Sequence, residues 1–231
     1  MLKTKKSKII SLTIFLLIQA VFLLLVVITG DGNFSVVVIS ALFVTLSFSK
    51  TKSYLFTQIA LVTTVCADIF LVVIKPMIQL PAMIFFSITQ ISYFLRIFFE
   101  TNNKLERKIH LIIRVLSSVL ILIVTLAVLR QNTDALSLVS MFYYTNLVLN
   151  VVFAFIHFKK SPFFAIGLLL FFFCDTIIGF DIMADDYLTG SLVEWVNNIF
   201  KGANWAWIFY VPSQALIATS LIKFNKKKSS T

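Results

Sequence analysis

The chain has 231 residues, of which 59% are hydrophobic and only 13% charged, and its formal net charge is +10. A soluble domain carries about a quarter charged residues, so this composition excludes an ordinary soluble fold. The lysines and arginines gather near the two ends and in short gaps between apolar runs, a placement that orients membrane helices and does not suggest nucleic-acid binding. We therefore expect an integral membrane protein without a nucleic-acid partner.

Apolar runs of about 20 residues recur along the chain, and each could cross a hydrocarbon layer of roughly 30 Å as a helix. The runs are continuous and not alternating, which favours helices over the strands of a barrel. We predict an all-α, polytopic bundle that forms a single domain over residues 1–231. Its eight predicted spans cover about 9–29, 34–49, 54–73, 79–99, 111–129, 135–157, 163–182 and 203–222.

The first span follows four lysines, and no small-residue cleavage site comes after it, so we expect a retained helix and not a signal peptide. With eight spans and both termini cytoplasmic, all lysines and arginines except Lys75, Arg130 and Lys201 lie on the inner side. We expect a multi-pass protein of the plasma (cytoplasmic) membrane. The outer segment 185–202 is consistent with either a short helix on the membrane surface or an ordinary loop.

Two aspartates lie inside apolar spans, Asp68 in "TTVCADIFLV" and Asp175 in "FFFCDTIIGF". An ionised aspartate in the middle of a membrane costs about 2.5–3.5 kcal/mol on insertion scales. A helical rise of about 1.5 Å per residue puts Asp68 about 21 Å and Asp175 about 18 Å above the inner ends of their spans, at one depth. A protonated, hydrogen-bonded aspartate is the structural alternative, but for the pair we favour a function.

Polar residues at helical spacing reach this depth on the fourth, sixth and eighth spans, and Thr57, Thr64 and Asp68 share one face of the third span. Each of them alone could be helix–helix contact material worth about 0.6 kcal/mol. Four polar stripes and two acids at one depth instead predict a shared pocket. We predict that Asp68 and Asp175 are catalytic, and that the substrate-binding residues are Gln90, Tyr93, Tyr143, Asn146, Tyr210 and Gln214.

Two carboxylates held close together cannot both ionise cheaply, which places a general acid beside a general base. Paired carboxylates of this kind cleave glycosidic bonds through an oxocarbenium-like state. We expect no metal and no cofactor, because the only histidines, His110 and His157, lie at inner helix ends without ligand spacing. The sequence also has no nucleophile elbow and no phosphate loop. Cys66 and Cys174 lie in spans and are expected to stay unpaired.

Four short stretches, "CADIFLV", "FFSITQISYF", "GLLLFFFCDTIIGF" and "YVPSQALIATS", together resemble the YhhN-type membrane proteins, which include lysoplasmalogenases. The family is similar in length, with about eight spans. It carries Gly-Asp on an early helix, a His-x-x-Tyr-like element on the next, a late Ser-Asp-like pair and a final helix with Tyr and Gln. The order and spacing match along most of residues 40–222. Three positions depart from the pattern: Ala67 replaces the glycine, Gln90 the histidine and Cys174 the serine.

The resemblance implies hydrolysis of the vinyl-ether bond of a lysoplasmalogen, with a lysophospholipid or ether lipid as substrate and membrane lipids as surroundings. Two alternatives remain open at this point. One is a proton-coupled transporter that uses the aspartate pair for coupling. The other is a membrane protein that binds lipid without catalysis, which the departures at Ala67 and Gln90 permit. The sequence does not indicate an oligomeric state.

Overall fold

The protein is described from a computed structural model, which places residues 5–29, 34–46, 52–74, 76–130, 133–186 and 205–222. These residues form eight α-helices and one short π-helix, and none of them is in a strand. The all-α fold predicted from the sequence is therefore confirmed. The elements are α1 (Lys5–Thr29), α2 (Phe34–Leu46), α3 (Lys52–Asp68), η1 (Ile69–Val73), α4 (Gln79–Glu100), α5 (Lys104–Leu129), α6 (Ala135–Ile156), α7 (Pro162–Asp186) and α9 (Trp205–Thr219).

Six of the described helices are long and apolar enough to cross a membrane, namely α1, α3 with η1, α4, α5, α6 and α7. The second predicted span corresponds to α2, a shorter apolar helix that ends at Leu46. The eighth corresponds to α9, which has 15 residues. The molecule therefore has the architecture of a multi-pass integral membrane protein.

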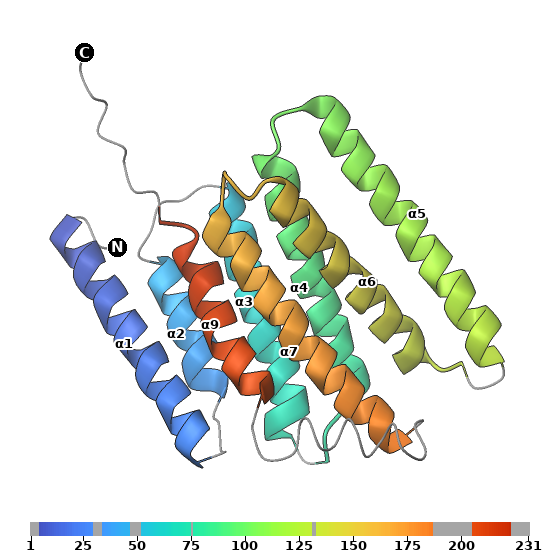
Figure 1. Ribbon diagram of the computed structural model, residues 1–231, viewed down its shortest axis with the longest axis horizontal. Helices are drawn as coiled ribbons and strands as arrows, with labels where there is room; N and C mark the ends of the chain where they lie inside the picture. Colours follow the sequence, from blue (N-terminus) through green and yellow to red (C-terminus); the bar gives the residue numbers. More distant parts are fainter. Residues whose placement is uncertain are drawn as a thin grey trace.

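Successive helices run in alternating directions through one bundle, as Figure 1 shows. The start of α1 and the end of α9 consequently lie at the same end of the bundle. This end also carries the exposed lysines Lys6, Lys104, Lys108 and Lys159, and we call it the basic end. Helix α5 forms one edge of the bundle, where it packs on α6, and α1 forms the other edge against α2 and α9.

Short polar side chains begin two of the spans. Asn103 accepts a hydrogen bond from the Leu105 amide at 2.9 Å, which caps α5. Asp134 accepts one from the Ser137 amide at 2.8 Å, which caps α6. Hydrogen bonds from Ser137 lower the pKa of Asp134, which is exposed outside the spans. The predicted outer segment 185–202 lies almost wholly outside the described residues.

Helices α7 and α9 approach each other closely at Gly167. A Cβ atom at this position would lie 2.8 Å from Cγ1 of Ile217, and 3.1 Å from both the Ile217 nitrogen and the Ser213 oxygen. Only a residue without a side chain allows the two backbones to come this near. The contact fixes α9 against α7 and so sets the position of Tyr210 relative to Asp175.

The span predicted over residues 54–73 is present as one continuous helical segment, but its last five residues are not regular α-helix. Helix α3 ends at Asp68, and the wider turn of η1 follows, in which the Ile74 amide donates to the Ile69 oxygen at 3.0 Å. Such π-turns hold one extra residue and are frequent at functional sites. Apolar periodicity does not reveal this change, because η1 is as apolar as the helix before it.

Candidate functional site

Asp68 lies at the junction of α3 and η1, and only 5% of its surface is exposed. Its carboxylate accepts a hydrogen bond from the hydroxyl of Tyr210 on α9. The two residues are 142 positions apart in the chain, so the contact exists only in the folded bundle. Tyr210 is also buried, and its ring packs edge-on against Trp207 and Phe171.

Asp175 lies on α7 and is bound in the same way. Its carboxylate accepts a hydrogen bond from the hydroxyl of Tyr143 on α6. Tyr143 is 5% exposed and Asp175 is half-buried. Two aspartates at membrane depth thus each receive one phenol hydroxyl from a neighbouring helix.

The two tyrosine–aspartate pairs belong to one cluster. Asp68 and Asp175 are close enough to interact electrostatically, and Tyr210 lies within electrostatic range of both carboxylates. The rings of Phe86 and Phe171 link the two tyrosines. The ring centroids are 5.6 Å apart between Tyr143 and Phe86, 6.2 Å between Phe86 and Phe171, and 6.0 Å between Phe171 and Tyr210. The structure therefore assembles both predicted acids at one site, between α3, α6, α7 and α9.

Three further predicted site residues are fully buried and keep polar atoms without a partner among the described residues. They are Nε2 of Gln90, the hydroxyl of Tyr93, and both amide atoms of Gln214. Tyr93 lies within electrostatic range of Asp175. A buried polar group without a hydrogen bond costs about 1–3 kcal/mol. Such groups are expected where water or a ligand completes the hydrogen bonding.

Asn146 is bound elsewhere. Its Oδ1 accepts a hydrogen bond from Nη1 of Arg114, and its Nδ2 donates to the Phe142 carbonyl at 2.8 Å. Asn150 makes the next link, since it accepts from Nη2 of Arg114 at 2.7 Å and donates to Oε1 of Gln90 at 2.9 Å. Both ends of Asn146 are thus engaged with protein. It helps to hold Arg114 in place.

Arg114 and Arg96, which the charge pattern places among the basic residues of the inner side, are both buried side chains. Arg114 is 7% exposed and its guanidinium lies 4.3 Å from the ring centroid of Phe94. Arg96 is 1% exposed, donates to Thr57 at 3.1 Å and lies 3.8 Å from the ring centroid of Phe164. Their positions inside apolar spans indicate buried, partnered side chains, since charges within a membrane are costly and almost always have partners.

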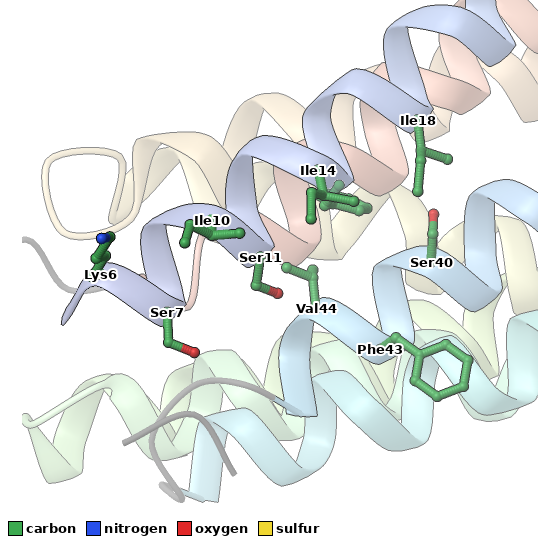
Figure 2. A pocket seen from close by; sticks show the side chains of 10 residues that line it. Lys6, Ser7, Ile10, Ser11, Ile14, Ile18, Ser40, Phe43 and Val44 are labelled. Carbon is green, nitrogen blue, oxygen red and sulfur yellow. The ribbon is translucent and has the colours of Figure 1, made fainter. Parts of the chain in front are cut away.

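A separate groove of about 700 Å³ lies between α1 and α2. Figure 2 shows isoleucines of α1 on the side of Val44 and Ser40 of α2, with Lys6 at the end nearest the start of α1. None of the predicted site residues lines this groove. It is therefore distinct from the carboxylate cluster.

Comparison with known families decides the classification. The model of the YhhN family matches residues 33–221, a range that contains every predicted site residue. The chain belongs to the YhhN family. No curated protein and no solved structure gives a significant match.

Two of the three departures from the YhhN pattern lie at this cluster, and the third, Gln90, contacts Asn150 of the Arg114 network. Ala67 is completely buried beside Asp68, and Cys174 is buried and within electrostatic range of Asp68. Nε2 of Gln90 is a hydrogen-bond donor without a partner in the described part of the chain. In this YhhN protein the position where the family usually has histidine therefore still offers a donor, but one that cannot transfer a proton near neutral pH.

Proposed function

We propose that this YhhN protein is an intramembrane hydrolase that cleaves the vinyl-ether bond of a lysoplasmalogen-type lipid. The observation that supports this most is the Asp68–Asp175 pair, in which each carboxylate is held by a tyrosine hydroxyl inside the bundle. Paired carboxylates at an apolar site supply an acid and a base to the same bond. The buried donors of Gln90, Tyr93 and Gln214 would bind the polar part of the substrate.

The proposed reaction begins with proton transfer from the protonated carboxyl to the enol-ether carbon that does not bear oxygen. The adjacent carbon and the ether oxygen then share a positive charge as an oxocarbenium ion. The second carboxylate takes a proton from water, which adds to that carbon and gives a hemiacetal. Collapse of the hemiacetal releases a fatty aldehyde and a glycerophospho-alcohol, so one water is consumed and no oxidant or metal is needed.

The tyrosines have a defined part in this scheme. Each hydroxyl donates to one carboxylate and would fix its orientation. A fixed dipole near a charge that changes during reaction lowers the barrier, because no reorganisation is required. The rings of Phe86 and Phe171 pack against the tyrosines and help to hold them in place.

The test is an assay of purified full-length protein in detergent with two lysophospholipids of equal chain length and headgroup, one vinyl-ether and one acyl-linked. Free aldehyde should appear only from the vinyl-ether lipid. Asp68→Asn and Asp175→Asn should each lower turnover by about 10²–10⁴-fold, the usual contribution of one acid–base group. Asp134→Asn makes the same chemical change at an exposed cap, where asparagine is equally suitable, and should leave turnover unchanged.

Each other outcome has a defined meaning. If both site variants keep wild-type turnover, the carboxylates take no part in the chemistry. If the wild type releases no aldehyde but takes up solute into vesicles in a proton-dependent manner, the pair couples transport. Lipid binding with neither activity would identify a non-catalytic lipid-binding protein.

We also propose that the basic end faces the cytoplasm, with both termini there, and that the protein resides in the plasma membrane. The exposed lysines at this end support the orientation, since basic residues are retained on the cytoplasmic side. Single cysteines at Lys159 and Met77, in a background with Cys66 and Cys174 replaced by serine, should react with impermeant reagents from opposite sides. Reaction of both from one side would contradict the orientation.

A further inference from the structure

A second group of titratable side chains lies at the basic end, away from the carboxylate pair. Glu106 and His110 are one turn apart on α5, and His157 directly follows α6. Nε2 of His157 lies 3.1 Å from Oε1 of Glu106, and Nε2 of His110 lies 3.8 Å from the same oxygen. One ligand atom from each residue lies within 4.8 Å of the other two.

These three atoms match the donor set and spacing of a zinc site. Zinc sites with an open position use three protein ligands, and two histidines with one glutamate are a known combination. Metal–ligand bonds of about 2.0–2.2 Å in a tetrahedron separate the ligand atoms by about 3.3–3.6 Å. The separations of 3.1 and 3.8 Å from the Glu106 oxygen lie on either side of this range, and the third is at most 4.8 Å, so side-chain shifts alone could bring the three atoms to the spacing that zinc requires.

The surroundings provide both rigidity and access. His110 is 2% exposed, and its ring lies 4.0 Å from that of Phe153 on α6, centroid to centroid. The side chains of Glu106 and His157 are 31% and 24% exposed, so an ion could enter from water and keep an aqueous ligand. Nε of the neighbouring Arg107 donates a hydrogen bond to the Thr101 carbonyl at 2.6 Å, so this nitrogen is engaged outside the group of three ligands.

We propose that Glu106, His110 and His157 bind one Zn²⁺ ion, which links the start of α5 to the end of α6. Helix α5 lies at the edge of the bundle and packs on α6, so it is the helix that gains most from such a link (Figure 1). Two turns above Glu106 on the same face, Arg114 contacts Asn150, which contacts Gln90. The ion would therefore also fix the network that reaches the carboxylate site. The proposed zinc site does not depend on the proposed hydrolysis.

The chain favours a clear test because it contains only two histidines, and both belong to this group. Protein purified without a histidine tag would be stripped with chelator and titrated with Zn²⁺, with bound metal counted after desalting and thermal unfolding recorded in parallel. One Zn²⁺ per chain and a raised unfolding temperature are expected, since a ligand that binds only the native state stabilises it. Glu106→Gln and His157→Gln should each weaken binding by about 10-fold or more, because even changes to groups behind the ligands cost 10–100-fold.

Glu100→Gln alters another carboxylate at the same end and should leave Zn²⁺ binding unchanged. Co²⁺ should give the spectrum of nitrogen and oxygen ligation in both the wild type and Cys174→Ser. A thiolate charge-transfer band lost in Cys174→Ser would instead place the metal beside Asp68 and overturn the proposal. Failure of the wild type to bind Zn²⁺ would also overturn the proposal. The same holds if Glu106→Gln and His157→Gln both bind Zn²⁺ with wild-type affinity while their metal-free unfolding temperatures match that of the wild type.

Discussion

Replacement of Gly167 by alanine tests the packing that brings α9 and its Tyr210 to the carboxylates. The new Cβ would lie 2.8 Å from Cγ1 of Ile217 and 3.1 Å from two backbone atoms, the Ile217 nitrogen and the Ser213 oxygen. A side chain can rotate away, but the backbone atoms move only if α9 moves. Overfilling of a packed interior costs about 1–3 kcal/mol. Removal of a glycine from a helix returns about 1 kcal/mol.

Gly179 on the same helix is the matched control, because a Cβ there meets nothing within 4 Å. Gly179→Ala should therefore gain up to about 1 kcal/mol from helix propensity. Gly167→Ala should be less stable than Gly179→Ala by about 1–3 kcal/mol, the cost of overpacking alone. Thermal unfolding of both variants and the wild type in one detergent measures this difference. Equal unfolding temperatures for the two variants would refute the close approach of α7 and α9.

Three further predictions concern the carboxylate site and the buried network of Arg114. Tyr143→Phe and Tyr210→Phe each remove one hydrogen bond to a carboxylate, worth about 1.5–3 kcal/mol, so kcat should fall roughly 10- to 150-fold; unchanged kcat in both would show that the hydroxyls are bystanders. Gln214→Leu should fold at least as stably as the wild type, because the amide has no partner among the described residues. It should nevertheless lower kcat/KM, and an unchanged kcat/KM would contradict a role of Gln214 in substrate binding. Arg114→Met should lower stability by about 1–3 kcal/mol through the amide oxygens left unpaired, whereas Arg130→Met, at an exposed site on the other end of α5, should not; equal unfolding temperatures would argue against the buried network.

Several features of the site follow from local sequence alone. An aspartate in an apolar run is so costly that Asp68 and Asp175 stand out without any structural information. A fixed rise per residue then predicts one depth for both, and in the structure the two lie within electrostatic range of each other. The helical period likewise points Tyr143 and Tyr210 to the same region, where they bind the two acids.

Other features depend on partners that the sequence does not reveal. Asn146 shares a stripe with Tyr143, yet the long side chain of Arg114 reaches across from α5 and binds it. The pairing of His110 with His157 arises because α5 and α6 are antiparallel neighbours, although 46 residues lie between them in the chain. The periodicity of polar residues describes one helix face at a time, so it does not predict contacts between long side chains of different helices.

Hydrolysis of a vinyl-ether lysophospholipid in D₂O would test the paired-carboxylate mechanism most directly. Protonation at carbon by a carboxyl that exchanges with solvent must place one deuterium beside the aldehyde carbon of the product. Immediate reduction to the alcohol would trap that label for mass analysis before it exchanges. We expect one deuterium per product molecule from the wild type and a loss of labelled product, along with turnover, in Asp68→Asn and Asp175→Asn. Aldehyde released without deuterium, or labelled at wild-type rates by both variants, would contradict the mechanism.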